Sequence, residues 1–353
     1  MFEEKQPNLT PIAHLGEFGL IKRLTESFSF NNESTELSIG DDAAIINPDG
    51  KKVVVSTDIL AEGVHFNLGY VPLKHLGYKA VVVNISDIAA MNATPTQILV
   101  SIAVSNRFPV EALEEIYSGI ALACDRYKVD LVGGDTTSSN AGLMITITAI
   151  GLESDDKIVK RSGAKANDLL ITTGDLGGAY MGLQILEREH SVFLANPNMQ
   201  PEMEGFDYIL ERQLKPEART DIKKKLEELD IIPTSMMDIS DGLASEVLHL
   251  SDQSNVGFRV YEEKIPMDEL TITTADEFNL NPTMTALSGG EDYELLLTIA
   301  PGDYDKIKNH PDFTIIGHAV EKEEGNYMIL RGSNELSKIT AQGWDAFLNK
   351  DSE

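Results

Sequence analysis

The apolar residues in the first half of the chain follow two alternating spacings. Leu20, Leu24 and Phe28 recur four residues apart within Glu17–Phe28, which is the spacing of one helix face. Residues 52–60 are rich in β-branched side chains and predict a strand. By the same criteria we expect helices over 73–91 and 109–127, and strands over 96–104, 130–134 and 143–152. The first half therefore predicts an alternation of strands and helices.

The second half repeats this alternation. A strand over Asp168–Thr173 leads into a glycine-rich turn and then a helix that reaches about Glu189. Further helices are expected near 204–213 and 216–229 and from Asp241, with strands over 234–238, 257–261, 294–299, 314–317 and 327–330. The charged segment Glu153–Asn167 is the best candidate for a domain boundary, because 353 residues are too many for one typical core. We expect two α/β or α+β domains of similar size.

Eleven acidic residues are concentrated in short motifs beside glycine, serine or threonine. Carboxylates in such surroundings suit hard divalent cations that bridge phosphates. Several of them end apolar stretches, where open sheets place their ligands. Burying so many like charges without cations would be unfavourable. The motifs are Gly40-Asp41-Asp42, Ser56-Thr57-Asp58, Glu62 beside His65, Asn84-Ile85-Ser86-Asp87, Gly133-Gly134-Asp135, Asp238-Ile239-Ser240-Asp241 and Gly290-Glu291-Asp292-Tyr293-Glu294.

Each motif also has a simpler interpretation. The acidic pair after Gly40 is commonly a turn, and Asp238 could cap the helix that begins near Asp241. The backbone N–H groups of Gly174–Gly178 could hold an anion, but tight packing of that loop explains the glycines equally well. The sequence has neither a P-loop motif nor histidines at zinc-like spacing. Hard-metal chemistry therefore remains the leading interpretation.

Net charge and cysteine content limit the possible binding partners and the cellular environment of the protein. The formal net charge is −28, which argues against nucleic acid because no basic surface is available to neutralise its phosphates. The only cysteine, Cys124, falls in an apolar helical stretch and excludes an intramolecular disulfide. The polar segment Met1–Pro11 does not resemble a signal peptide, and apolar runs such as Leu143–Leu152 are too short to span a bilayer. We expect a cytoplasmic protein that meets phosphorylated ligands through metal ions and binds no membrane.

A series of motifs extends over residues 16–347. They are Glu17–Ile21, Gly40–Ala44, Ser56–Leu60, Glu62–Phe66, Tyr78–Ala80, Val83–Met91, Gly133–Thr137, Arg161–Ala164, Met237–Leu243 and Gly289–Glu294. In this order they resemble the thiamine-monophosphate kinase family, of the aminoimidazole ribonucleotide synthetase-like superfamily. The resemblance implies that residues 1–153 form an N-terminal domain that binds ATP and Mg²⁺ and pairs sheet to sheet in a homodimer. Residues 154–353 would form a C-terminal α/β domain that completes the active site.

The resemblance also implies roles for single residues. Several Mg²⁺ ions would be bound or supported by Asp42, Ser56, Thr57, Asp58, Asp87, Asp135, Asp238 and Asp241. ATP would contact Tyr117, Gly134, Asp135, Arg161 and Ser240, and thiamine monophosphate would contact His65, Glu291 and Trp344. Without the resemblance, His65 would be read as a surface residue and Trp344 as a packing residue. The chain departs from the family at Asn92, where glycine is usual, and over the polar stretch Ser191–Gly205.

The implied reaction converts ATP and thiamine monophosphate into ADP and thiamine diphosphate. The acceptor phosphate, with a second pKa of about 6, is already largely ionised at neutral pH. No general base is therefore needed, and we expect direct in-line transfer that depends on positioning and charge neutralisation. Two alternatives stay open: an ATP-dependent synthetase of the same superfamily and a non-catalytic nucleotide-binding paralogue. Asp41, Asp292 and Glu294 are expected to be structural neighbours of the site.

Overall fold

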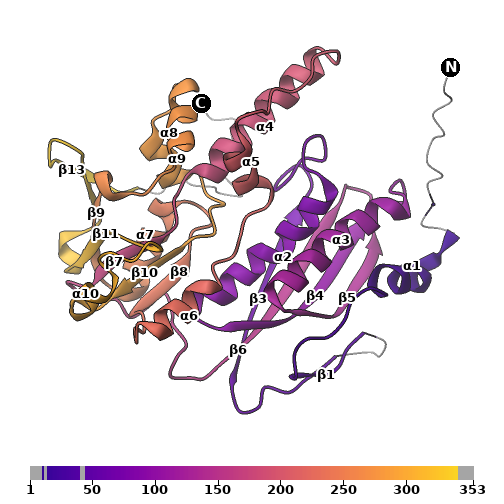
Figure 1. The fold of residues 1–353 in the computed structure, drawn as a ribbon, viewed down its shortest axis with the longest axis horizontal. Coiled ribbons are helices and arrows are strands. Elements are labelled where there is room, and N and C mark those ends of the chain that lie inside the picture. The colour runs from indigo at the N-terminus through magenta and orange to yellow at the C-terminus, as the bar shows by residue number, and fades with distance from the viewer. Residues whose placement is uncertain (1–9, 12–13, 40–43, 341–353) are drawn as a thin grey trace. The chain divides into compact units, whose positions relative to one another are not determined.

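The computed structural model describes residues 10–11, 14–39 and 44–340. The chain forms two compact units, one of Met1–Ile88 with Thr94–Glu153 and one of Ala89–Ala93 with Ser154–Glu353 (Figure 1). Each unit combines helices with a β-sheet, which confirms the predicted α/β (α+β) class. Across the described residues, no helix is both long and apolar enough to cross a membrane.

The first unit is built on a four-stranded sheet in the order β3-β6-β4-β5. β6 (Met144–Glu153) is antiparallel to both β3 (Lys52–Ala61) and β4 (Thr94–Val104), and β5 (Asp130–Ser138) runs parallel to β4. These strands match the predicted ones to within a few residues. Before the sheet come α1 (Gly16–Thr25) and the short pair β1 (Thr35–Leu37) and β2 (Ile45–Ile46).

Two long helices, α2 (Leu73–Ala90) and α3 (Val110–Tyr127), cover one face of this sheet (Figure 1). They approach each other at two glycines. A Cβ on Gly77 would lie 1.9 Å from the carbonyl oxygen of Ile116, and one on Gly119 would lie 1.9 Å from that of Lys74. Along β6, alternate residues from Ile145 are buried, while those between them are partly exposed. One face of the sheet is thus core and the other is open.

The second unit contains a seven-stranded sheet in the order β13-β12-β9-β11-β7-β10-β8. Every neighbouring pair is antiparallel except β12 and β9, which are parallel. The strands are β7 (Leu169–Thr173), β8 (Ser235–Asp238), β9 (Gly257–Tyr261), β10 (Leu295–Ile299), β11 (Phe313–Val320), β12 (Tyr327–Ile329) and β13 (Leu336–Lys338). Its centre follows the predicted strands, whereas β13 has no counterpart in the prediction.

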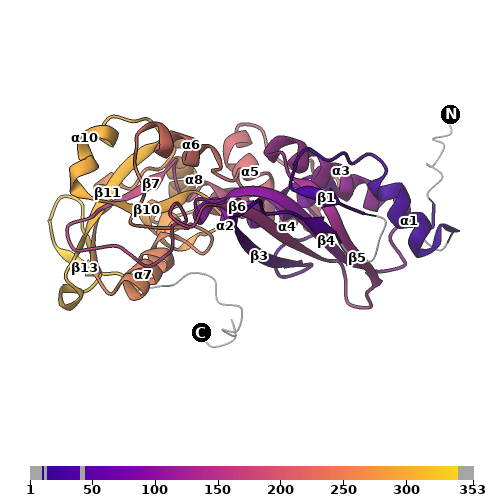
Figure 2. The same cartoon turned by 90° about the horizontal axis from the view of Figure 1, so that it is seen from below.

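Helices cover both faces of this second sheet. Leu170, Met237 and Leu296 pack with α7 (Leu243–Ser254). Their strand neighbours Ile171, Met236 and Leu297 pack with α6 (Asp221–Glu228) and α10 (Tyr304–Ile307). Figure 2 shows α7 on one side of the strands and α6 and α10 on the other. Because both sets of alternating side chains are buried, these strands read as continuous apolar runs.

Several elements differ from the prediction. The polar helices are shorter than expected, α5 over Asp207–Leu214 and α6 over Asp221–Glu228. The helices α8 (Glu269–Glu277) and α9 (Pro282–Ser288) were not predicted. The stretch Ser191–Gly205 begins as the last turn of α4 (Gly178–Ala195).

Asn92 lies just after α2, where the chain adopts a left-handed conformation. Its φ is +58° and its side-chain Nδ2 donates to the carbonyl oxygen of Lys157 over 2.9 Å. Glycine is usual in such a position, and asparagine is the residue that tolerates it next best. The departure from the family at Asn92 therefore falls at a helix end.

Candidate functional site

Three of the predicted metal-binding positions meet between β3 and α2 in the first unit. The Oγ of Ser56 donates to Oδ2 of Asp87 over 2.5 Å. Asp58 is two residues further along β3, so its side chain is on the same, helix-covered face. The backbone N–H of Asp58 donates to Oδ1 of Asn84 over 2.9 Å. Asn84 and Asp87 are one turn apart on α2 and so reach the strand together.

The carboxylates of Asp58 and Asp87 interact unfavourably when both are ionised. Burial is the main cause that raises the pKa of Asp58 to about 6, and the negative charge of Asp87 raises it further. Two acidic side chains and a hydroxyl at one place provide the hard oxygen ligands that Mg²⁺ prefers. A cation would relieve the repulsion, so the residues present fit a divalent metal ion.

Thr57 and Asp135 lie on the opposite, open face of the same sheet. Thr57 pairs with Thr148, and its Oγ1 donates to the carbonyl oxygen of Ile147 over 3.0 Å. Asp135 is exposed and aligned with Ser101 of β4, in the edge strand furthest from β3. Consecutive residues of a strand point to opposite faces. A single chain therefore does not bring Asp135 together with Asp58.

Three further predicted contacts belong to the first unit. A Cβ on Gly134 would lie 1.8 Å from the carbonyl oxygen of Val100, so only glycine fits there. Tyr117 is 7% exposed and packs edge-on against Phe28, and burial raises its pKa to about 12. His65 is in an exposed turn, where its Nδ1 accepts from the backbone N–H of Ala61 over 3.1 Å. In the neutral imidazole the proton is therefore on Nε2.

The second unit brings Asp238, Ser240, Asp241 and Glu291 to one end of its sheet. Asp238 is buried at the end of β8, paired with Leu295 of β10. The backbone N–H of Glu291 donates to the carbonyl oxygen of Ser240 over 2.7 Å. The chain segment that ends β8 and the one that leads into β10 therefore continue their pairing beyond the sheet. This arrangement places a predicted ATP contact and a predicted substrate contact side by side.

Asp241 has two charged neighbours that the motifs alone do not pair with it. Burial raises its pKa, whereas the positive charges of His249 and Arg161 lower it. Its backbone N–H donates over 2.9 Å to Oε1 of Glu246, a residue that is 1% exposed. Burial, followed by the charges of Asp241 and Asp238, raises the pKa of Glu246 to about 8. Glu246 was not a predicted site residue, because it reads as an ordinary first-turn glutamate of α7.

The glycine-rich turn after β7 binds the carboxylate of Asp292, a residue of the protein itself. The N–H of Gly177 donates to Oδ2 of Asp292 over 2.8 Å, and Asp292 is 1% exposed. A Cβ on Gly174 would lie 2.3 Å from Oε1 of Glu294. The loop thus shows both predicted features: its backbone binds the carboxylate of Asp292, and it packs closely on Glu294. Burial raises the pKa of Asp292 to about 7, although Arg212 opposes that shift.

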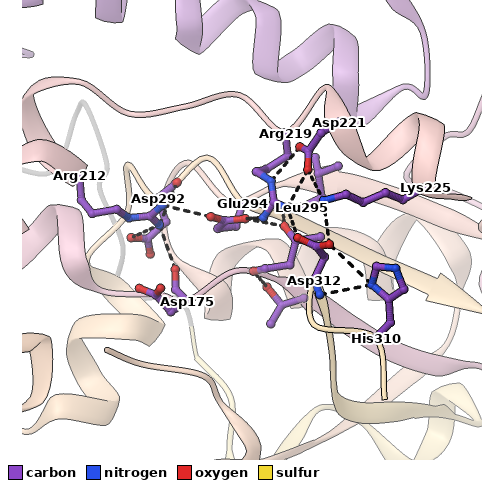
Figure 3. Close-up of polar contacts among 12 residues, drawn as sticks. Asp175, Arg212, Arg219, Asp221, Lys225, Asp292, Glu294, Leu295, His310 and Asp312 are labelled. Carbon is purple, nitrogen blue, oxygen red and sulfur yellow. Dashed lines mark hydrogen bonds and ion pairs between the residues drawn. The ribbon is translucent and has the colours of Figure 1, made fainter. Parts of the chain in front are cut away.

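Two arginines that the motif analysis missed hold the same segment (Figure 3). The Nη1 of Arg212 donates to Oε1 of Glu294 over 3.0 Å, and the Nη1 of Arg219 donates to Oε2 over 2.6 Å. The Nη2 of Arg219 also reaches Asp312 over 3.2 Å. Asp292 and Glu294 are therefore neutralised within the protein, as expected of structural residues. Arg212 is on α5 and Arg219 lies in the loop before α6, both in polar segments where sequence gives no sign of a buried partner.

Two predicted site residues, Asp42 and Trp344, lie outside the described residues. Within 10–11, 14–39 and 44–340, no group of three His, Cys, Asp or Glu side chains comes together in a way that could hold a metal ion. Within the first unit, the carboxylates of Asp58 and Asp87 and that of Asp135 lie on opposite faces of the sheet.

Comparison with known proteins gives the family. Residues 40–152 match the model for the N-terminal domain of AIR synthase related proteins. The chain is 33% identical over 339 residues to the thiamine-monophosphate kinase of Aquifex aeolicus, covering 95% of this chain and 99% of that protein. It is also 33% identical over 341 residues to the Bacillus subtilis thiamine-monophosphate kinase, covering 94% and 100%.

Solved structures give the same result. A structure of AaThiL complexed with AMPPCP and TMP superposes with a TM-score of 0.72 at 31% identity, covering 95% of this chain and 98% of that one. The thiamine-monophosphate kinase of Stenotrophomonas maltophilia K279a gives a TM-score of 0.76 at 26% identity, covering 91% and 98%. The hydrogenase maturation protein HypE, at 19% identity, shares the fold. By its identity to relatives that it covers almost completely, the chain belongs to the thiamine-monophosphate kinase family.

Proposed function

We propose that this protein is an ATP:thiamine-phosphate phosphotransferase, which converts thiamine monophosphate into thiamine diphosphate. Membership of the family supports this activity, and a relative was solved with AMPPCP and TMP. The observation that carries the proposal is the meeting of Asp58, Asp87 and Ser56 on one face of a sheet. The exposed carboxylate of Asp58, the partly buried carboxylate of Asp87 and a hydroxyl suit a cation that binds phosphate.

Asp58, Asp87 and Ser56 are the described residues that would hold Mg²⁺, with Asp238 and Asp241 as candidates in the second unit. Bound there, Mg²⁺ would neutralise phosphate charge and leave the terminal phosphoryl group open to attack. Asp42, Thr57 and Asp135 remain proposed ligands or supports. Each of these two groups offers only two carboxylates. We therefore infer that phosphate oxygens and water would complete the coordination of Mg²⁺.

The remaining site residues would bind and orient the two substrates. Arg161, whose positive charge acts on Asp241, would reach the nucleotide phosphates near Ser240. Gly134 and Tyr117 remain proposed nucleotide contacts. His65 would donate a hydrogen bond from Nε2 to thiamine monophosphate. Glu291 and Trp344 would contact the cationic ring of the same substrate. The acceptor phosphate needs no base, so we infer in-line transfer without a phosphoenzyme.

We further propose that the protein is a homodimer in which the open faces of two N-terminal sheets pack together. Val55 and Ile59, on the open face of β3, are 58% and 51% exposed. Such a row of apolar side chains on a sheet is typical of an interface. Covering this face would also remove the carboxylate of Asp135 from water, which favours a cation beside it. In this arrangement residues 1–153 bind ATP and Mg²⁺ and dimerise, and residues 154–353 complete the site.

Acceptor specificity tests the proposed function. The purified protein is incubated with ATP and Mg²⁺ together with either thiamine monophosphate or unphosphorylated thiamine. We expect thiamine diphosphate from the first acceptor and no phosphorylated product from the second, because the nucleophile is an ionised phosphate. Binding of ATP with no product from either acceptor would instead favour a non-catalytic paralogue.

A further inference from the structure

We propose that Gln213 is a positioning residue for substrate recognition, which fixes the carboxylate of Glu291 against the cationic ring of the acceptor. The inference rests on the proposed function. It concerns a residue on α5 that none of the acidic motifs includes. Three observations carry it: the backbone of Glu291, the hydrogen bond to its side chain, and the packing that places Gln213.

The backbone around Glu291 is held in a sparsely populated conformation. Gly290, Glu291 and Tyr293 have φ values of +71°, +59° and +53°. A left-handed residue other than glycine costs on the order of 1 kcal/mol, so its surroundings must enforce it. The N–H of Tyr293 donates to the carbonyl oxygen of Ile239 over 2.9 Å, next to the bond between Glu291 and Ser240. This backbone directs the Glu291 side chain in one defined direction from the sheet.

A neutral amide then fixes the side chain. The Nε2 of Gln213 donates to Oε2 of Glu291 over 2.8 Å. Gln213 is 5% exposed and Glu291 is partly buried, so this bond is partly shielded from water. An arginine or lysine at this position would neutralise the carboxylate that is meant to attract a cation. Glutamine orients Glu291 without adding an opposite charge beside its carboxylate.

The position of Gln213 depends on how closely α5 approaches α4. A Cβ on Gly182 would lie 2.0 Å from the carbonyl oxygen of Ile209 and 2.9 Å from Cβ of Gln213. One turn earlier, a Cβ on Gly178 would lie 3.3 Å from Cγ of Arg212. These glycines are on one face of α4 and admit the backbone of α5 to close range. Gln213 is thereby presented at a fixed distance from the loop.

Arg212, the preceding residue of α5, binds Asp292 and Glu294 of the same loop (Figure 3). Its Nη1 contacts Glu294, and its Nη2 lies 3.6 Å from Oδ1 of Asp292 and donates over 2.9 Å to the carbonyl oxygen of Asp175. Arg212 thus binds the structural carboxylates of Asp292 and Glu294, whereas Gln213 binds Glu291, the carboxylate proposed to contact the substrate. This division explains why two adjacent helix residues have different chemistry.

The test uses two variants of nearly equal size. Gln213→Met keeps the volume but removes the donor, and Gln213→Glu places a second acid beside Glu291. We expect Gln213→Met to raise the KM for thiamine monophosphate about tenfold, with the KM for ATP and kcat nearly unchanged. We expect Gln213→Glu to raise it further at pH 8. Its KM ratio to the unmodified enzyme should fall as the pH falls, because a protonated glutamate can donate to Glu291. For Gln213→Met that ratio should not depend on pH.

Glu211→Gln is the matched control, since Glu211 is on α5 with a side chain that is 65% exposed. Circular dichroism and thermal melts check that each variant folds. An unchanged KM for thiamine monophosphate in Gln213→Met, or parallel losses toward both substrates with no pH effect in Gln213→Glu, would overturn the inference while leaving the kinase activity in place. Absence of thiamine diphosphate formation by the unmodified protein would instead overturn the proposed function.

Discussion

Ser56, Thr57 and Asp58 are consecutive in the sequence but serve two faces of one sheet. Ser56 and Asp58 meet Asp87 under α2, while Thr57 is on the open face that also carries Asp135. The composition of the motif indicates cation chemistry, but only the strand register separates its members. At this scale the sequence predicts the type of chemistry, cation binding, for these residues. It could not identify Gln213 or Arg212, because their partners are about 80 residues away along the chain.

Asp58→Asn tests the proposed cation site. Replacing the carboxylate with an amide should lower kcat by about a hundredfold or more and weaken Mg²⁺-dependent ATP binding. The thermal midpoint should stay equal or rise, because the repulsion from Asp87 disappears. Steady-state kinetics, calorimetric titration of ATP with and without Mg²⁺, and a melting curve provide the measurements. The control is Asp125→Asn, at an exposed position of α3; equal activity in both variants would contradict a metal role for Asp58.

Glu246→Gln tests the effect of a buried acid on stability against pH. The pKa of Glu246 is raised to about 8 from an ordinary 4.5, so between these values the folded protein keeps a proton that the unfolded chain has released. The free energy of unfolding should therefore decrease as the pH rises from 4.5 to 8 and then level off. The glutamine cannot ionise, so the variant does not lose this stability. As the pH is raised from 5 to 8, its thermal midpoint should rise relative to that of the unmodified protein by on the order of 4 °C. Parallel melting curves across that range would rule out this role.

At the scale of elements, the spacing of apolar residues predicted the long helices and the central strands. β7, β8 and β10 are buried on both faces and appear as unbroken apolar runs. The helices α8 and α9 escaped prediction because α8 is rich in threonine and α9 has only seven residues. α5 packs its apolar residue Ile209 on α4 and approaches that helix closely at Gly182. Such contacts have no local signature in sequence.

The crossing of α2 and α3 gives a prediction at this scale. Gly77→Ala would place a methyl group 1.9 Å from the carbonyl oxygen of Ile116, so the helices must separate. We expect a loss of about 3 kcal/mol in the free energy of unfolding, measured by urea titration. Gly302→Ala is the control, because no atom lies within 4 Å of a Cβ there. If both variants unfold at the same urea concentration, the crossing is looser than the structure indicates.

At the scale of the whole molecule, the chain consists of two units, and each carries part of the proposed site. The first holds Asp58 and Asp87, and the second holds Asp238, Ser240 and Glu291. The sequence predicted the fold class and the motif residues through their resemblance to a family. It could not predict that Asp58 and Asp135 of the first unit lie on opposite faces of one sheet, because that depends on the strand register.

The proposed homodimer gives a prediction for the assembly. Ile59→Lys puts a charge on the open face of the first sheet, where Ile59 is 51% exposed. Burying that charge in an interface would be costly, so the variant should be monomeric by light scattering at concentrations where the unmodified protein is dimeric. Leu122→Lys is the matched control, since Leu122 is 44% exposed on α3 and should leave the dimer intact. If Ile59→Lys still forms dimers, the dimer interface does not lie on the open face of this sheet.

A single-turnover experiment tests the central claim most directly. Protein in excess is mixed with Mg²⁺, thiamine monophosphate and ATP labelled in its γ-phosphate. Samples are quenched with acid at intervals and separated into protein and small-molecule fractions. We predict that the label moves from ATP into thiamine diphosphate in one phase, with none on the protein at any time. ATP that stays bound and unreacted, or label that passes through the protein, would contradict direct phosphoryl transfer between the two substrates.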